Sequence, residues 1–315
     1  MANRYKFTAL LLACCAVVAL FIGQGLTLDN YQFFLSRRIP KLLAIILAAV
    51  CISASSLVFQ TITNNRILTP SILGFDSLYL LIQALLVVLW GTSSVVIAHP
   101  IINFLISCAV MTGLALTLFH FYFSRKGNDI FTLLLLGVVL GSVFSSCANF
   151  LIMLIDPNEF TTLQAMMFAS FNNVNDTLVY WVSLPLVLCL WWLLRSAATL
   201  DVLWLGPDNA TSLGVNGPKM VKRCMFIITV MVAISTALVG PVLFFGLITV
   251  SLTRQVFQWH QHKYLIIASG LLAVLLLVSG QWVVEKVLGF DTTISVIINF
   301  VGGTYFLYLL YKNKV

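Results

Sequence analysis

Charged side chains are scarce in this chain of 315 residues, because Asp, Glu, Lys and Arg together make up only 9% of it. In soluble domains these four residue types make up about a quarter of the chain. Hydrophobic residues reach 61% instead. This composition excludes an ordinary soluble domain and indicates an integral membrane protein.

Signatures of catalysis and metal binding are also missing. The chain contains no G-x-x-x-x-G-K-[ST], H-E-x-x-H or G-x-S-x-G motif. Its seven cysteines form no C-x-x-C pair and fall in or beside apolar runs, where we expect them to pack as small side chains. His260-x-His262, beside Lys263, is expected to be a solvated loop rather than a metal site. We therefore expect that this chain is not an enzyme and that it holds no cofactor or metal site.

Acidic residues cluster at loop positions, and only Asp76 and Glu285 come near the apolar runs. Both are interpreted as lying at a membrane interface. A proton-driven pump is expected to place carboxylates inside its spans. If this protein moves a solute uphill, the energy is expected to enter from another polypeptide.

Long apolar runs recur throughout the chain, and most are long enough to cross a hydrocarbon core, which takes about 20 helical residues. Lipid admits only helices and closed barrels, and these runs lack the alternation of barrel strands. The sequence therefore predicts an all-α polytopic membrane protein with about ten transmembrane helices, the eighth of them short. The first run is too long for a typical signal peptide and is expected to be an uncleaved span. The predicted spans are 7–26, 39–62, 77–98, 100–123, 130–155, 177–195, 224–240, 242–257, 264–284 and 293–311.

Basic residues give the orientation. If all ten runs cross and both termini are cytoplasmic, thirteen of the 17 basic residues lie inside, as the positive-inside rule requires. Topology and anionic lipid therefore account for the net charge of +7, and no nucleic-acid partner is implied. The inner residues are Arg4, Lys6, Arg66, Arg125, Lys126, Arg195, Lys219, Lys222, Arg223, Arg254, Lys263, Lys312 and Lys314, and the outer ones are Arg37, Arg38, Lys41 and Lys286.

The predicted cytoplasmic loop of about residues 196–222 is unusually polar. Gly206-Pro207-Asp208 predicts a helix start, with proline in the first turn and an acid near the positive helix end. Gly214 is placed to end that helix. An apolar edge is predicted from Leu205, Ala210 and Leu213. Periodicity favours equally a helix that binds a protein partner and one that folds back on the bundle.

The loop sequence "LWLGPDNATSLGV" resembles the L-x-x-L-G-x-x-x-A-x-x-L-G-[VI] motif of the FecCD-like permeases, the membrane subunits of ABC importers for ferric siderophores, haem and vitamin B12. Further resemblances follow in order along nearly the whole chain. "RIPK" is similar to the family's R-[LI]-P-R, and "QTITNNRILTPSILG" to Q-x-x-x-x-N-P-L-A-x-P-x-x-L-G. "GPVLFFGL" is similar to G-P-I-x-F-V-G-L, and "FVGGTYFLYLL" to I-G-G-P-F-F-L-Y-L-L.

This resemblance implies a type II ABC importer permease fold, with residues 1–315 forming one transmembrane permease domain in the bacterial inner membrane. The implied partners are a second permease subunit, two P-loop ATPases that carry ATP and Mg, and a periplasmic or lipid-anchored substrate-binding protein. In the family the polar loop docks on the ATPase, so the resemblance assigns coupling to Leu205, Gly206, Pro207, Asp208, Ala210, Leu213 and Gly214.

Departures from the family pattern suggest the substrate class. The proline after Asn65 is replaced by Arg66, and the arginine near the end of the ninth span by Glu285 or Lys286. Such substitutions resemble the subgroup that imports ferric catecholate siderophores such as enterobactin, vibriobactin, anguibactin or petrobactin. Haem and cobalamin are the alternative substrates. An ion-coupled secondary transporter is a further alternative, although neither intramembrane charge nor a clear internal repeat supports it.

Two groups of residues are expected to contact partners or substrate. Outer basic residues suit an acidic binding protein, or else are interfacial anchors. The small and weakly polar residues of the fifth and tenth spans could line the path, although helix packing is the slightly favoured interpretation of the fifth-span stripe, in which Gly137 and Gly141 recur at helical spacing. The docking set is Arg37, Arg38, Lys41 and Lys286, and the path set is Gly141, Ser142, Ser145, Asn149, Ser295 and Asn299.

Overall fold

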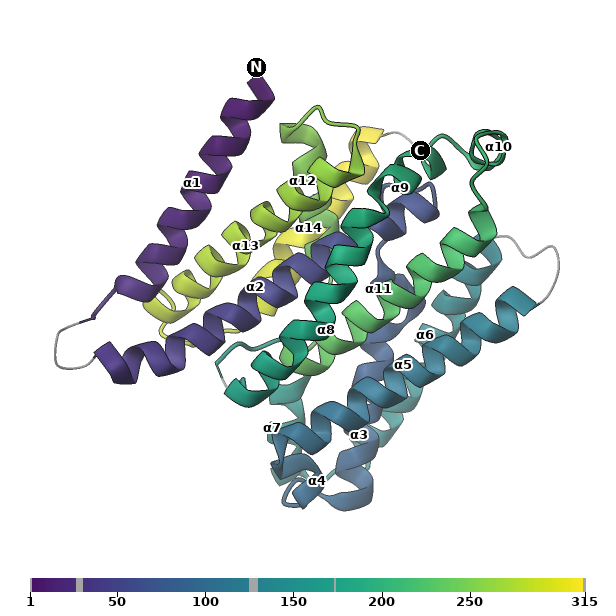
Figure 1. Ribbon diagram of the computed structural model, residues 1–315. Coiled ribbons are helices and arrows are strands. Elements are labelled where there is room, and N and C mark those ends of the chain that lie inside the picture. The colour runs from purple at the N-terminus through teal and green to yellow at the C-terminus, as the bar shows by residue number, and fades with distance from the viewer. Residues whose placement is uncertain (1, 27–30, 125–129, 173, 314–315) are drawn as a thin grey trace.

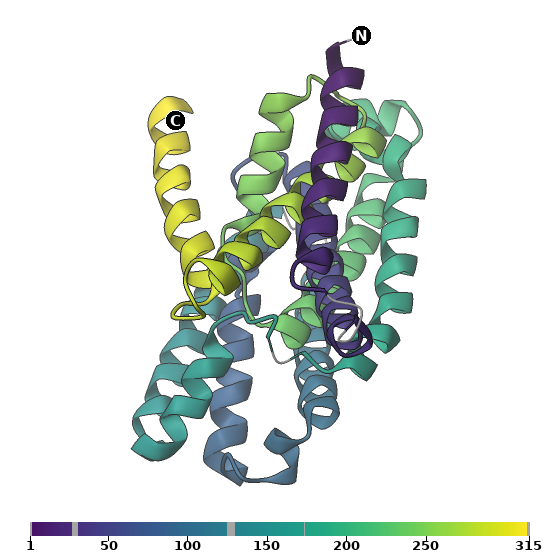
Figure 2. The same ribbon diagram turned by 90° about the vertical axis from the view of Figure 1, so that its left-hand side faces the viewer.

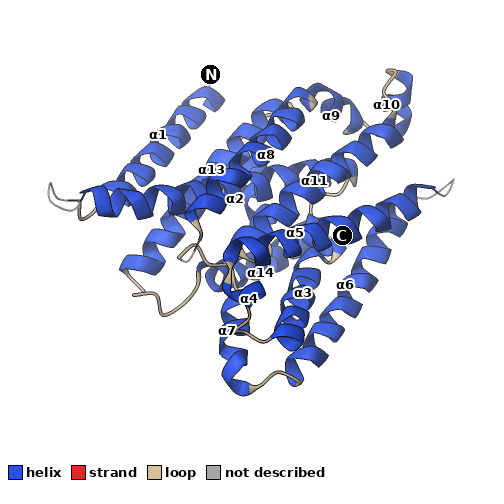
Figure 3. Cartoon of the chain, turned by 60° about the horizontal axis from the view of Figure 1, so that its bottom comes forward, coloured by secondary structure: helices blue, strands red, loops and turns tan. Residues whose placement is uncertain are grey.

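The computed structural model describes residues 2–26, 31–124, 130–172 and 174–313. Within these ranges the chain is helical and contains no strand, and Figure 3 shows the helices joined by loops. The elements are α1 (Ala2–Gly23), α2 (Tyr31–Ile62), the 3-10 helix η1 (Pro70–Leu73), α3 (Phe75–Trp90), α4 (Val95–Ala98), α5 (Pro100–Ser124), α6 (Ile130–Met153), α7 (Pro157–Met167), α8 (Asp176–Arg195), α9 (Ala197–Leu203), α10 (Pro207–Ser212), α11 (Gly217–Val239), α12 (Phe245–Val256), α13 (His262–Lys286) and α14 (Ile294–Asn313).

Each predicted span overlaps a helix, which confirms the all-α polytopic fold. Seven helices of the described chain are long and apolar enough to cross a membrane, and α3 and the part Ile294–Tyr308 of α14 are shorter apolar helical segments. The predicted span 77–98 is wrong in its second half, since α3 ends at Trp90 and α4 follows separately. Gly91 has a φ of +72°, which breaks the helix, and Glu159 accepts a hydrogen bond from the freed Thr92 amide at 3.0 Å.

Helix α2 lies at the centre of the bundle. It packs against α8, α9, α11, α12 and α13, and it is the most buried of the candidate spans. Its buried faces are rich in alanine and serine, and such small residues let membrane helices approach closely. At Gly246 of α12 the approach is so close that a β-carbon would collide with Ser56.

The two ends of the bundle differ. In Figure 1 the N-terminal end of α1, the C-terminal end of α14 and α10 share one end, which we call the α10 end. Helices α4 and α7 lie at the opposite end, which we call the α7 end. Figure 2 shows from a second direction that both chain ends lie in the upper part of the bundle, apart from each other. Arg125, Lys126 and Lys314, which are predicted to be cytoplasmic, lie outside the described residues.

The glycines of the fifth-span stripe serve packing. A β-carbon built on Gly141 would lie 3.0 Å from the Gly74 α-carbon, and one on Gly137 would lie 2.9 Å from the Leu73 α-carbon. These contacts let η1 and the start of α3 lie directly on α6. For Gly137 and Gly141 the structure therefore supports the packing interpretation.

We expect Gly141→Ala to lower the thermal unfolding temperature of the purified protein in detergent. The new methyl group would press on backbone atoms, and overpacking of this kind costs about 1–3 kcal/mol. Gly113→Ala in α5 is the matched control, because nothing lies within 4 Å of its built β-carbon. Equal unfolding temperatures for the two variants would contradict the packing role.

Candidate functional site

Helix α10 forms a short projecting segment at the α10 end (Figure 1). It begins at Pro207, after Gly206 with a φ of +99°, and Gly214 with a φ of +78° follows its last turn. Both glycines occupy backbone conformations that L side chains rarely adopt. The helix start and end predicted from the sequence are confirmed.

The apolar edge of this segment is smaller than predicted. Leu205 and Leu213 are 56% and 63% exposed, whereas Ala210 is fully buried at 0%. Helix α10 packs on α9 and α11, and Ala210 also accepts a hydrogen bond from the Val215 amide at 2.9 Å. Ala210 therefore anchors the segment, and the two leucines are the apolar groups that it presents, beside the exposed Asp208.

Helix α9, which leads into α10, is tied to two long helices by a histidine. Asp201 Oδ1 accepts hydrogen bonds from the His262 backbone amide at 2.7 Å and from its Nδ1 at 2.6 Å. On the other side of the ring, His262 Nε2 lies 2.7 Å from Thr61 Oγ1 at the end of α2. This link joins α9, α13 and α2.

The interpretation of His262 as a residue of a solvated loop is wrong, because its side chain is only 2% exposed. His260, two residues earlier, is exposed as expected. The three linked residues are distant in sequence, so local spacing gave no signal for them. In the part of the chain that the structure describes, no group of three metal-ligating side chains occurs.

The outer basic residues lie near the α7 end, at the start of α2 and the end of α13. Arg38 donates hydrogen bonds to the carbonyl oxygens of Ile22 and Gln24 at 2.7 and 2.6 Å, which fixes the end of α1. Arg37 is exposed, with its guanidinium 4.7 Å from the centre of the Phe33 ring, and Lys286 is also exposed. Of these three, only Arg37 and Lys286 remain open to a partner.

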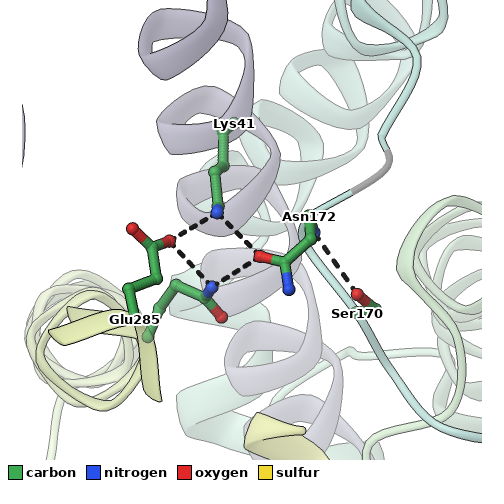
Figure 4. Close-up of polar contacts among 5 residues, drawn as sticks. Lys41, Ser170, Asn172 and Glu285 are labelled. Carbon is green, nitrogen blue, oxygen red and sulfur yellow. Dashed lines mark hydrogen bonds and ion pairs between the residues drawn. The ribbon is translucent and has the colours of Figure 1, made fainter. Parts of the chain in front are cut away.

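Lys41 belongs to an internal polar cluster (Figure 4). Its ammonium group forms an ion pair with Glu285 and donates to Asn172 Oδ1 at 2.7 Å. Gln281 Nε2 closes the cluster by donating to Asn172 Oδ1 at 3.0 Å and to Glu285 Oε1 at 2.9 Å. The four side chains join α2, α13 and the segment between α7 and α8, so Lys41 already has a carboxylate partner within the chain.

The weakly polar side chains of α6 face an open pocket. Ser142, Ser145 and Ser146 line it together with Ser71 and Ser77, and its volume is about 560 Å³. Gly141 contributes its backbone to the same wall, and Asn149 is exposed farther along the helix. The three serines of α6 are therefore available to solvent or a ligand.

The predicted path residues of α14 have different surroundings. Ser295 is buried and lies 3.4 Å from the Ala169 carbonyl oxygen, to which its hydroxyl donates. Asn299 is half-buried, and within the described chain its buried Oδ1 has no hydrogen-bond partner. Helix α14 packs on α12 and α13, whereas α6 packs mainly on α3 and η1. The path residues thus form two separate groups.

Asp76 is buried within the protein. It is in the first turn of α3, where a carboxylate suits the positive helix end, and it is only 8% exposed. Its Oδ2 is buried and has no hydrogen-bond partner among the described residues.

Comparisons with known proteins agree over the whole chain. A family model described as the FecCD transport family matches residues 6–312. The petrobactin import system permease protein YclO of Bacillus subtilis is 46% identical, with 100% of this chain and 99% of YclO covered. The petrobactin import system permease protein FatC of Bacillus anthracis is 32% identical, with 99% of this chain and 90% of FatC covered. A solved metal-chelate type ABC transporter in an inward-facing conformation superposes with a TM-score of 0.85 at 22% identity, over 98% of this chain and 99% of that chain.

We expect Asp201→Ala to destabilise the protein, because it removes the acceptor of two hydrogen bonds from His262. Bonds to a charged group contribute about 1.5–3 kcal/mol each in favourable cases, so the unfolding temperature in detergent should fall clearly. Asp208→Ala is the control, since this exposed aspartate of α10 should lose only a helix-dipole effect of roughly 0.5 kcal/mol. An equal effect of the two substitutions would rule out the structural role of the link.

Proposed function

Because the chain belongs to the FecCD transport family, whose members are transport subunits of ABC importers and not enzymes, we propose that it is a permease that moves an iron–siderophore complex across the bacterial inner membrane. The observation that carries this proposal is the projecting α10 segment, with its two exposed leucines at the end shared by both termini. Such a segment is suited to transmit movement from a cytoplasmic ATPase. We assign the α10 end to the cytoplasm on the same basis as the predicted positive-inside orientation.

The substrate proposal rests on the relatives. YclO and FatC both carry petrobactin import in their names, and both cover nearly all of this chain. Petrobactin is among the siderophores implied by the departures at Arg66 and Glu285. We therefore propose a ferric siderophore of the catecholate type, ahead of haem and cobalamin.

Coupling is proposed to run through α9. An ATPase that holds Leu205 and Leu213 would move α10, and α9 is joined to α13 and α2 through Asp201, His262 and Thr61. A push on the segment would therefore reach two of the central helices. Leu205, Gly206, Pro207, Asp208, Leu213 and Gly214 are the proposed contact residues, with Ala210 as their anchor.

The other two sites follow from exposure and charge. We propose that the serine-lined pocket on α6 and the polar residues of α14 form the path together with a second permease subunit. At the α7 end, Arg37 and Lys286 are proposed to meet acidic residues of a substrate-binding protein, with Arg38 and Lys41 behind them.

The proposal is tested by purifying the tagged chain from its native membranes in mild detergent. We expect a P-loop ATPase and a second permease to copurify, and mass spectrometry identifies both. Reconstituted with them, the protein should take up ferric siderophore when ATP is supplied, and haem and cobalamin serve as competing substrates. Recovery of the chain alone, with transport driven by an ion gradient, would support a secondary transporter instead.

We further expect Leu213→Asp to uncouple transport from ATP hydrolysis. A carboxylate at the centre of an apolar contact should weaken ATPase binding by roughly 2 kcal/mol, which is about 30-fold in affinity. Leu213 is exposed, so folding should not suffer. Thr161→Asp, which adds the same charge at an exposed position of α7 at the opposite end, is the control. Unchanged ATPase affinity in Leu213→Asp would contradict the assigned contact.

A further inference from the structure

Two arginines meet at one tryptophan beside the α10 segment. The Arg254 guanidinium carbon lies 4.9 Å from the centre of the Trp204 ring, and that of Arg66 lies 5.5 Å from the same centre. Trp204 caps the end of α9 and directly precedes Leu205. Arg66 comes from the loop after α2, and Arg254 from the last turn of α12.

Neither arginine has an acidic partner in the described chain. The ion pairs there are Lys41 with Glu285 and His262 with Asp201. Asp201, a carboxylate of the helix that Trp204 ends, is engaged by His262. Arg254 Nε and Nη2 are buried and make no hydrogen bond within the described residues, while Arg66 is exposed. Two like charges side by side and unsatisfied buried donors are unfavourable, so this arrangement is suited to an anion supplied from outside.

The position of the pair favours a protein over a lipid as the source of that anion. Arg66 follows α2, the central helix, which contacts α9 and α13, and Thr61 in its last turn is hydrogen-bonded to His262 of α13. Trp204 adjoins Leu205, the first residue of the proposed ATPase contact. The site is therefore continuous with the surface on which the ATPase is proposed to dock.

We propose that Arg66, Trp204 and Arg254 bind a carboxylate side chain of the docked ATPase, an inference that rests on the proposed function. Arg66 meets the carboxylate at the surface, where its planar fork can form two parallel hydrogen bonds. Contact with the indole ring holds the guanidinium in place. Arg254, which is more deeply placed, adds a second positive charge. This carboxylate site is polar and adjoins Leu205 of the apolar contact. A charged contact beside an apolar one fixes the register of α10 on the ATPase.

The test uses the complete importer, purified with the ATPase that accompanies the wild-type chain and placed in lipid nanodiscs. Arg66→Gln is expected to weaken ATPase binding at least tenfold and to reduce the salt dependence of that binding. Arg66→Lys should fall between this variant and the wild type, because it keeps the charge and loses the fork. Arg223→Gln, which removes an exposed arginine from the start of α11 at the same end, should change the affinity less than twofold.

Charge reversal identifies the partner group. Arg66→Glu should abolish binding, and one Asp→Arg or Glu→Arg substitution in the ATPase should restore it. If Arg66→Gln and Arg223→Gln behave alike while the wild type holds its ATPase, the inference fails and the proposed function stands. If Arg66→Gln weakened ATPase binding only in nanodiscs of anionic lipid, the site would be assigned to a lipid headgroup and the inference would be overturned. A wild-type chain that holds no ATPase would overturn the proposed function together with the inference.

Discussion

Close packing around α2 is the constraint on which the rest of the structure depends. The helix has 32 residues and is therefore about 48 Å long. Its small side chains allow α11, α12 and α13 to approach it, and their contacts keep it fixed within the bundle. Lys41 near its first turns joins the polar cluster near the α7 end, and Thr61 near its last turn joins the link to α9. One continuous helix thus runs between the two sites at which partners are proposed to dock.

Local patterns in the sequence predicted the helices well, because apolar runs and glycine–proline signals act over a few residues. The start of α10 at Pro207 and the break at Gly214 follow directly from backbone preferences. The end of α3 before Gly91 was not predicted, because the apolar run continues through residues 95–98. A hydropathy average over such a run is insensitive to a single glycine, whatever its φ. Burial of Ala210 was missed for a related reason, because an alanine suits both a contact surface and a tight anchor.

Pairings between distant residues could not be predicted from one sequence. His262 is buried because Asp201 and Thr61 supply polar partners from other helices, and without them a histidine beside Lys263 resembles a loop residue. Gly137, Gly141 and Ser145 of α6 recur every four residues, yet the two glycines pack on η1 and the start of α3 whereas the Ser145 side chain faces a pocket. Spacing identifies a helix face, and only the neighbouring elements decide whether that face is covered.

The polar cluster near the α7 end reduces the number of basic side chains that remain available to a partner. Glu285 lies at or beside the position where the family pattern has an arginine. Its carboxylate forms an ion pair with Lys41 within the chain. Arg38 is likewise occupied by carbonyl groups at the end of α1. A partner would therefore meet mainly Arg37 and Lys286, and exposed charges of this kind affect association rate and orientation more than affinity. Lys41 and Glu285 instead hold the segment that carries Asn172 against α2 and α13, and this segment also supplies the Ala169 carbonyl that contacts Ser295 of the proposed path. A partner carboxylate that competed with Glu285 for Lys41 would loosen the same segment, so a partner docked there would act on the contacts that hold Ser295 of the proposed path.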